Sequence, residues 1–337
     1  MTLGDWINHW VSIGCPGRKK KSAGRRSVER YEQILRVHVI PALGERRLQQ
    51  LHATDIDNLY EDLENKLAPR SQHQVHVALG ACIRAAMRKG LLSVNPIDRA
   101  EKVPSPGECD HGQVLDQEQL ASLVQSFRGT TIYAIIATAA FTGARRNEIH
   151  ALQWSDLDPA KKTLRIERSV EESRGVPAQL ARRLKEPKRA SHKRTIAIDD
   201  SLIALLLSKR DKHLRLAAGV PHGAAVDLSL IKLPEGALMF PSFDDGPDFT
   251  RLRSAKPVTD LFTKRARKQF PGLRFHDLRG SHETALLDAG VPVHVVAARC
   301  GHDPAVLLKS YAKRTKGADT SAAKIIGNMS KAILGTD

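Results

Sequence analysis

The sequence predicts a mainly α-helical protein of two domains, in which only the second, α+β domain carries a small antiparallel β-sheet. Three observations lead to this prediction. The chain has 337 residues, which is too long for one small module and suits two domains. Residues 3–100 show apolar residues at helical spacing and no strand signal. Two segments of the second half, residues 163–170 and 194–198, alternate apolar and polar residues as half-buried strands do.

The first domain, residues 1–100, is expected to be a small helical bundle. Its helices are predicted from apolar spacing and from local start and stop signals: a cap at Ser27, a capping box that begins at Thr54, and breaks at Pro41 and Gly90. The expected helices cover residues 3–13, 27–39, 54–67 and 71–89, and Asn95-Pro96 closes the region.

Residues 101–112, rich in proline, glycine and charge, read as a linker. A second domain, residues 113–337, follows. Asp116 and Gln119 form a capping box, and Thr131–Phe141 is apolar all round, which predicts a buried helix. The remaining expectations are strands at 163–170 and 194–198, a helix at 202–217, a surface insertion at 219–235, a short strand at 238–241, and helices from 258 to the end.

The chain carries 53 Lys and Arg against 37 Asp and Glu, a net charge of +16. Such an excess indicates anionic partners, namely nucleic acid, an anionic membrane surface or an acidic protein. The densest basic cluster consists of Arg18, Lys19, Lys20, Lys21, Arg25 and Arg26. It is either a solvated loop or a clamp on the phosphate backbone of DNA, and its charge alone does not choose between them.

Other classes of protein and site are excluded or lack support. The longest apolar stretch, Ile132–Phe141, is too short to cross a bilayer, and no signal peptide is visible. The four cysteines lie far apart without a CxxC pair, so neither a zinc ribbon nor a disulfide framework is expected. No Walker-type ATP loop occurs. A reduced, cytoplasmic protein fits these observations.

Five polar landmarks follow one another in the second domain. They are Arg145 with Glu148 in TGARRNEI, the basic segment PKRASHKR before the second strand, His276 with Arg279 in HDLR, His302 after a glycine, and Tyr311. Residues three apart on a helix share a face, so His276 and Arg279 point the same way. Each landmark alone also has a reading without catalysis, as a helix junction, a basic hairpin, a helix start or a structural histidine.

Tyr311 lies near the end of the chain in a basic context, whereas packing explains the other three tyrosines. A phenol with an ordinary pKa of about 10 is a poor nucleophile without help. Two arginines, a lysine and histidines around one phosphate are the help that it requires.

The order Arg, Lys, His-x-x-Arg, His, Tyr resembles that of the tyrosine site-specific recombinases of the phage integrase family. The matching segments are TGARRNEI, EPKRASHKRTIAI, FHDLRGSHETALLDAG and CGHDPAVLLKSYAK. The first domain is similar to the family's core-binding domain through RYEQILRVHVIPALGERRLQQLHATDID and NPID. The resemblance covers nearly the whole chain. It implies a helical core-binding domain, an α+β catalytic domain, and site-specific DNA recombination that integrates or excises a mobile element.

Carried over by position, the resemblance implies a role for each landmark. Arg145 and Arg279 would bind the scissile phosphate, Lys188 would protonate the leaving 5′-hydroxyl, His276 would accept the proton of the nucleophile, His302 would donate a hydrogen bond to the phosphate, Glu148 would support the site, and Tyr311 would form a 3′-phosphotyrosyl intermediate. Arg189 and Lys193 compete with Lys188, which is preferred because it alone follows a proline. The covalent link conserves the bond energy, so no metal, ATP or other cofactor is expected, and His276, His282 and His302 are not expected to bind a metal.

The resemblance also implies partners and an assembly. The expected partners are double-stranded DNA with specific recombination sites, three further copies of the chain in a homotetramer on two duplexes, and accessory directionality proteins, with no membrane. A clamp around DNA would bring Arg18–Arg26 near the backbone, and the protein would associate with the nucleoid. The tail, Ala322–Leu334, has apolar residues at helical spacing and is expected to dock either on its own domain or on a neighbour.

Two features depart from the family's pattern. Gly280-Ser281 stand where family members often carry a large polar side chain after HxxR, which leaves open what supports the second arginine. The N-terminal arm-binding domain of many phage integrases is not visible, so the protein is expected to be either a simpler recombinase or a trimmed chain.

Two other functions remain as alternatives at this stage. A type IB topoisomerase shares the active-site chemistry and would relax supercoils without a specific site, but the helical first domain favours the recombinase. A non-catalytic DNA-binding regulator on the same fold is the third reading, and the complete set of landmarks counts against it.

Overall fold

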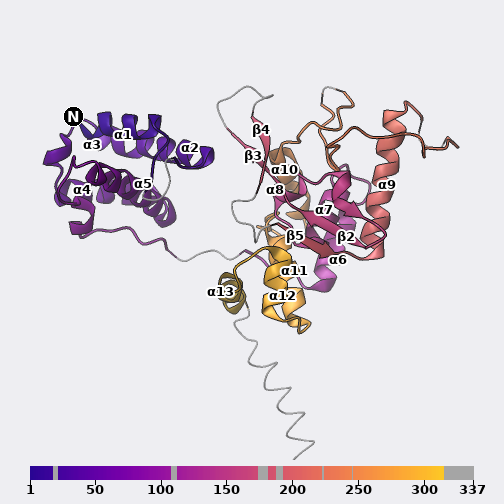
Figure 1. Ribbon diagram of the computed structural model, residues 1–337. Helices are drawn as coiled ribbons and strands as arrows, with labels where there is room; N and C mark the ends of the chain where they lie inside the picture. Colours follow the sequence, from indigo (N-terminus) through magenta and orange to yellow (C-terminus); the bar gives the residue numbers. More distant parts are fainter. Residues whose placement is uncertain are drawn as a thin grey trace, which may run out of the picture. The chain divides into compact units, whose positions relative to one another are not determined.

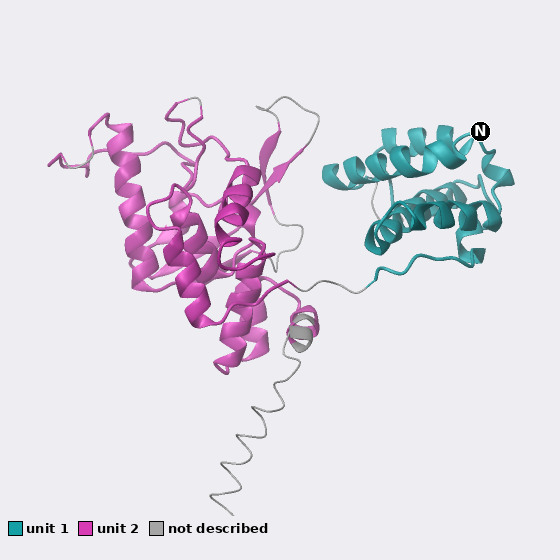
Figure 2. Cartoon of the chain, turned by 180° about the vertical axis from the view of Figure 1, so that it is seen from behind, with its two compact units in different colours: residues 1–110 teal, residues 111–337 magenta. Residues whose placement is uncertain are grey.

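The computed structural model of the chain describes residues 1–17, 22–107, 112–173, 181–186, 193–221, 224–244 and 246–314. Two compact units divide the chain, Met1–Asp110 and His111–Asp337 (Figure 2). The division falls inside the segment 101–112 that the sequence marks as a linker. Helices dominate both units, and all described strands belong to the second (Figure 1).

Unit 1 is a helical bundle. Its elements are α1 (Leu3–Ser12), α2 (Arg25–Ile34), the π-helical turn η1 (Leu35–Val39), α3 (Ile40–Leu43), the short turn η2 (Leu48–Gln50), α4 (Ala53–Glu64), α5 (Pro69–Arg88) and the turn η3 (Pro96–Arg99). The core contains buried Trp6 and Trp10 of α1 together with aliphatic side chains from the other helices. The indole of Trp6 donates a hydrogen bond of 3.1 Å to the carbonyl of Cys82, which ties α1 to α5.

The helical run that starts with α2 begins earlier and ends later than the sequence predicts, because α2, η1 and α3 follow one another without a break from Arg25 to Leu43. Gly24, rather than Ser27, precedes the helix, because its carbonyl accepts the first-turn bonds from the amides of Ser27 and Val28. Pro41 does not end the helix. The turn before it widens to π geometry, with the amide of Ile40 donating to the carbonyl of Leu35, and this accommodates a residue that lacks an N–H.

Helix α4 starts one residue before the predicted position, because Asp55 caps the backbone of His52. The Asp55 carboxylate accepts the backbone N–H of His52 at 3.1 Å, so the helix starts at Ala53 rather than at the predicted Thr54. It ends at Glu64, three residues before the predicted Leu67.

Unit 2 surrounds a buried helix. It contains α6 (Gln117–Ser126), α7 (Tyr133–Thr142), the short α8 (Arg146–Ile149), the turn η4 (Trp154–Asp156), α9 (Asp200–Ala217), α10 (Ala255–Ala266), α11 (Asp277–Asp288), α12 (Val293–Cys300) and α13 (Pro304–Arg314). The predicted capping box is confirmed, since Asp116 and Gln119 exchange bonds at the start of α6. Seven of the ten residues of α7 are buried, as its apolar sequence predicts, whereas Phe141 near its end is 44% exposed.

The β structure of unit 2 consists of two small antiparallel sheets. One has the order β1 (Leu157–Asp158), β2 (Thr163–Ile166), β5 (Arg194–Ala197), and the other pairs β3 (Ser169–Glu172) with β4 (Arg182–Lys185). The single strand predicted over 163–170 is therefore wrong. The chain bends after Ile166, where the guanidinium of Arg168 binds both carboxylate oxygens of buried Asp156 at 2.5 and 2.6 Å.

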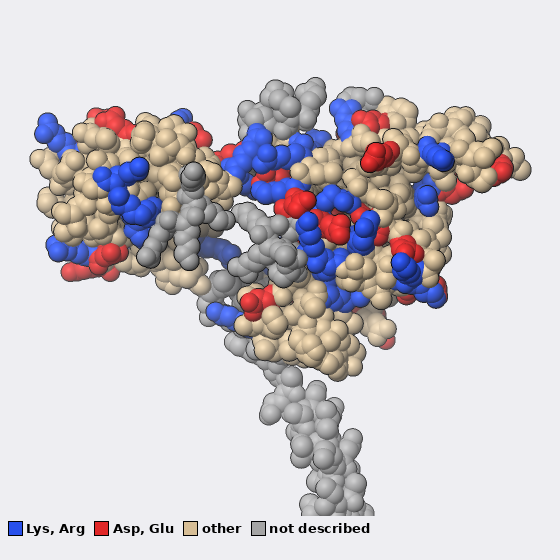
Figure 3. Space-filling model, in the orientation of Figure 1, with Lys and Arg blue, Asp and Glu red and all other residues tan. Residues whose placement is uncertain are grey.

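The β3–β4 hairpin is absent from the sequence predictions because ion pairs, not an alternating apolar pattern, line it. Arg183 and Lys185 both bind the Glu171 carboxylate, and Arg182 binds Glu172. On the face drawn in Figure 3, Lys and Arg side chains of unit 2 accordingly lie among Asp and Glu side chains. The short strand predicted at 238–241 is also wrong, since only Leu238 forms an isolated bridge, to Gln153.

Candidate active site

The turn Gly143–Arg145 lies where three helices meet. Gly143 ends α7 in the left-handed region, at φ +62°, and a Cβ there would lie 2.7 Å from Cδ2 of His282 and 3.0 Å from Sγ of Cys300. Glycine is therefore required twice, by conformation and by space. Nδ1 of His282 contacts the carbonyl of Ala140 at 3.0 Å, which ties α11 to the same turn.

Arg145 is held by two partners from different parts of unit 2. Its Nη1 donates to Oε1 of Glu148 at 2.8 Å, and its Nη2 donates to the carbonyl of Gly301 at 2.7 Å. The backbone amide of Arg145 donates to Oε2 of Glu148 at 2.9 Å. The side chain is still 32% exposed, so the guanidinium is fixed in place yet can reach an incoming group.

Glu148 is a buried carboxylate shared by two arginines. Arg194, at the start of β5, donates through Nη2 to Oε2 of Glu148 at 2.8 Å and through Nε to the carbonyl of Arg299 at 2.7 Å. Burial alone would raise the pKa of Glu148. The hydrogen bonds and positive charges of Arg194 and Arg145 outweigh burial and lower this pKa to about 2, so the carboxylate stays ionised.

Arg279 lies in the first turn of α11 and is only 2% exposed. Its Nη1 donates to the carbonyl of Gly143 at 2.7 Å, and its Nε lies 3.0 Å from Oε1 of Glu283. Its Nη2 is buried and has no hydrogen-bond partner among the described residues. A buried N–H of an ionised guanidinium without a partner is costly, so this donor is suited to an anionic ligand.

His302 enters the same cluster from the end of α12. Gly301 ends that helix in the left-handed region, and a Cβ there would lie 3.1 Å from Nη1 of Arg194. Gly301 therefore packs closely against Arg194. The next residue, His302, lies beside Glu283, with Nε2 of His302 2.9 Å from Oε1 of Glu283. We call Arg145, Glu148, Arg194, Arg279, Glu283 and His302 the arginine cradle.

His276 lies beside the arginine cradle, immediately before α11. Partial desolvation and the positive charge of Arg279 lower the pKa of His276. Both causes favour the neutral imidazole, which has a lone pair and can accept a proton.

Tyr311 is held elsewhere. Its hydroxyl donates to Oδ1 of Asp288 at 2.9 Å. Asp288 is the last residue of α11, nine residues after Arg279, and that separation corresponds to about 13 Å along a helix axis. Desolvation and the hydrogen bond to Asp288 raise the pKa of the phenol. The helix that carries Tyr311, α13, packs on α12, where Leu307 is buried with Val296.

The structure thus brings together Arg145, Glu148, Arg279 and His302, with His276 alongside, while it holds the Tyr311 hydroxyl at the other end of α11. Lys188, its competitor Arg189 and the tail 322–334 lie outside the described residues. Two members of the cradle, Arg194 and Glu283, were not predicted. The only sequence signal for Arg194 is that a charged residue starts a half-buried strand. The only signal for Glu283 is that it follows Arg279 by four residues, which places both on one face of a helix.

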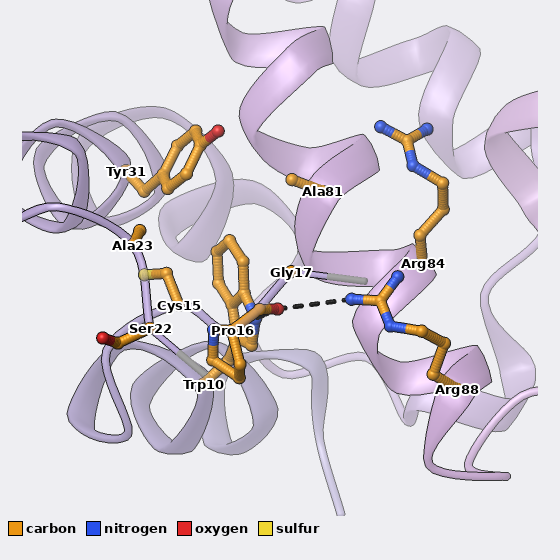
Figure 4. Close-up of a pocket in the computed structure, with 10 residues that line it drawn as sticks. All are labelled: Trp10, Cys15, Pro16, Gly17, Ser22, Ala23, Tyr31, Ala81, Arg84 and Arg88. Atoms are coloured by element: carbon orange, nitrogen blue, oxygen red, sulfur yellow. Dashed lines mark hydrogen bonds between the residues drawn. The ribbon is translucent and has the colours of Figure 1, made fainter. Parts of the chain in front are cut away.

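The basic cluster of unit 1 is described only in part. Arg18–Lys21 lie outside the described residues, and Arg25 pairs with Glu29 within α2 at 3.3 Å. Unit 1 contains a cavity of about 490 Å³, lined by Trp10 and Tyr31 and flanked by the guanidiniums of Arg84 and Arg88 of α5 (Figure 4). One of these, Arg88, donates to the carbonyl of Pro16 at 3.2 Å.

The described part of the chain contains no group of three or more His, Cys, Asp or Glu side chains placed to hold a metal ion. None of its helices has both the length and the apolar character that a membrane span needs.

Comparisons with known proteins identify the family of the chain. The model of the phage integrase family matches residues 113–317. An integrase of Streptomyces ambofaciens is 27% identical over 98% of this chain and 81% of its own length, and a XerC-like tyrosine recombinase of Caldanaerobacter subterraneus is 25% identical over 90% and 76%.

Solved structures show the same fold at lower sequence identity. The Tn1549 transposon integrase, in complex with transposon right end DNA, superposes with a TM-score of 0.73 at 17% identity, over 96% of this chain and 98% of that one. A lambda integrase dimer bound to a core site gives a TM-score of 0.63 at 14% identity, over 94% and 79%.

Proposed function

The chain belongs to the phage integrase family and is a site-specific DNA recombinase, and from this premise we propose that the arginine cradle binds the scissile phosphate while Tyr311 cleaves the strand. Double-stranded DNA is the substrate. The recombinase reading, rather than the topoisomerase or regulator alternatives, follows from the family and from its relatives.

One observation carries the proposal: two like-charged guanidiniums are held close together with donors to spare. Arg145 binds the carbonyl of Gly301, Arg279 binds the carbonyl of Gly143, and Arg145 lowers the pKa of Arg279 by charge repulsion, although burial is the larger cause. A phosphate between them would relieve that repulsion and accept from the unpaired Nη2 of Arg279. Such donors stabilise the extra negative charge of a pentacoordinate transition state.

The proposed reaction balances without an external cofactor. The Tyr311 oxygen attacks phosphorus and its proton passes to His276, while the bond to the 5′-oxygen breaks and Lys188 protonates that oxygen. The product is a 3′-phosphotyrosyl link. Attack by a 5′-hydroxyl reverses these steps on the same or a new strand, so the energy of the phosphodiester is conserved.

The contact between Tyr311 and Asp288 implies that the nucleophile moves before cleavage. The hydroxyl must leave the last turn of α11 and reach the phosphate at its first turn. Movement of α13 is consistent with its attachment, because Leu307 is the only buried side chain among those described in this helix.

We further propose the assembly in which this reaction would take place. Unit 1, with the cluster Arg18–Arg26, would act as the core-binding domain on the DNA backbone, and four copies of the chain would act on two duplexes. Accessory proteins would set the direction, and the tail 322–334 would dock either on its own domain or on a neighbouring copy. A lambda integrase tetramer bound to a Holliday junction, with a TM-score of 0.59 at 16% identity, has the same fold.

A suicide-substrate experiment tests the proposed chemistry. The protein is incubated with nicked duplexes that tile the DNA flanking its own gene, and covalent adducts are separated on a denaturing gel. Wild-type protein is expected to give an adduct on specific duplexes, and Tyr311→Phe to give none. An adduct that survives Tyr311→Phe would overturn the assignment, and relaxation of supercoiled DNA without a preferred site would instead favour the topoisomerase.

A further inference from the structure

Neither Gly280 nor Ser281, the two residues that follow Arg279, offers a side chain to hold its guanidinium. Gly280 has no side chain, and the hydroxyl of Ser281 donates to the carbonyl of Asp277 at 2.9 Å and accepts from the amide of Leu115 at 3.0 Å. The support comes instead from Glu283, one helical turn further on and 4% exposed. Residues four apart on a helix lie on one face, so Glu283 faces the same cluster as Arg279.

Three polar atoms meet at Glu283. Its Oε1 lies 3.0 Å from Nε of Arg279 and 2.9 Å from Nε2 of His302, and these two nitrogens are 3.2 Å apart. The N–H of Arg279 Nε donates to Nε2 of His302, and Oε1 of Glu283 lies within ion-pair distance of both side chains.

The consequence for Arg279 is a guanidinium fixed in two directions. The charge of the group is paired with Glu283, Nε donates to His302 and Nη1 donates to the carbonyl of Gly143, so the orientation of the guanidinium is fixed and Nη2 is the nitrogen without a partner among the described residues. The consequence for His302 is a ring that is held at Nε2, between Nε of Arg279 and the carboxylate of Glu283. One carboxylate thus orients two groups that reach the cradle from different helices.

From these contacts we infer that Glu283 is a positioning residue for DNA cleavage: it aims Arg279 and His302 at the scissile phosphate without touching the phosphate itself. The inference rests on the proposed function of those two residues. It also supplies the support that Gly280 and Ser281 leave open.

The test compares Glu283→Ala and Glu283→Gln with wild type in single-turnover adduct formation on the nicked duplex that wild type cleaves. We expect Glu283→Ala to slow adduct formation by about 10–100-fold, by analogy with the loss seen when a residue that orients a metal ligand is removed. Glu283→Gln keeps an acceptor oxygen and should slow it less. DNA affinity should stay unchanged in both, because Glu283 does not contact DNA.

A double-mutant cycle separates positioning from a general structural role. If Glu283 acts through His302, adding Glu283→Gln to His302→Ala should cost less than Glu283→Gln costs alone. If the two losses simply multiply, the inference is overturned. The cycle uses Glu283→Gln because Glu283→Ala leaves a buried charge on Arg279 and can prevent folding.

Asp156→Asn is the matched control, since Asp156 is also a buried carboxylate bound by an arginine but lies outside the cradle. Per folded molecule, as measured by thermal melting, it should cleave at the wild-type rate. If wild type itself gives no adduct, the proposed function fails and this inference with it. If wild type gives an adduct and Glu283→Gln cleaves equally fast, only the inference fails.

Discussion

The arginine cradle and the helix that carries Tyr311 are built in opposite ways. The cradle is held by charged groups that are mostly buried and come from α8, β5, α11 and α12, as in the Arg194–Glu148 pair, where both side chains are 6% exposed. Among its described side chains, α13 buries only Leu307, and the Tyr311 hydroxyl binds a carboxylate on the surface. Under the proposed function, the difference means that the phosphate site is organised before DNA arrives, whereas the nucleophile is delivered to it.

Removing a cradle arginine should have the largest effect on the reaction. Arg145→Ala is expected to slow adduct formation by about 10²–10³-fold, because the transition state loses a preorganised donor. The single-turnover rate on a nicked duplex is the measurement. Arg146→Ala is the control, because the neighbouring guanidinium turns away to Thr259, which it binds at 2.8 Å, and the rate should stay close to wild type.

The stability of the cradle should depend strongly on Arg194. Arg194→Ala leaves Glu148 buried with only Arg145, and breaking such a pair costs about 3–5 kcal/mol in free energy of unfolding. Urea denaturation of unit 2 measures this loss. Arg183→Ala on the β3–β4 hairpin removes a partner that is 54% exposed and should cost less than about 1 kcal/mol. Equal losses would contradict the contrast between a buried cradle and a solvated hairpin.

Acid should loosen the cradle through Glu148. Its pKa is about 2 in the folded protein and near 4.5 without partners, so the carboxylate stabilises the fold at neutral pH, and this contribution is lost as the pH falls from about 4.5 to 2. Burial by itself acts in the opposite direction, because it disfavours the ionised form of Glu148, but the two arginines outweigh it. The difference in unfolding free energy between wild type and Glu148→Gln should therefore shrink over that range. A difference independent of pH would rule out the shared ion pair.

Releasing Tyr311 should have the smallest effect. Asp288→Asn removes the carboxylate that helps to raise the pKa of the phenol and leaves the cradle intact, so adduct formation should be equal to or modestly faster than wild type. Ultraviolet titration of tyrosinate should show one phenol ionising at lower pH. A large loss of cleavage would mean that the Asp288 contact belongs to the reactive arrangement rather than to a resting one.

Local patterns predicted most of the fold. The apolar run of α7, the capping box of Asp116 and the break near Gly90 appear in the structure because each depends on neighbours in the chain. The errors occur where a distant partner decides. The strand over 163–170 is split where Arg168 turns to Asp156, and β4 forms through ion pairs with β3 although its sequence has no alternation.

The sequence by itself determined the family, the order of Arg145, His276, Arg279, His302 and Tyr311, and the glycines at 143 and 301, because these depend on residue type and spacing along the chain. Only the tertiary structure decided how the side chains are held. Arg145 meets Gly301 across 156 positions, and Arg194 meets Glu148 across 46. Pairing of buried charges over such separations depends on how helices and strands pack, and no local pattern records it. The same packing places Glu283 between Arg279 and His302 and leaves Tyr311 at Asp288.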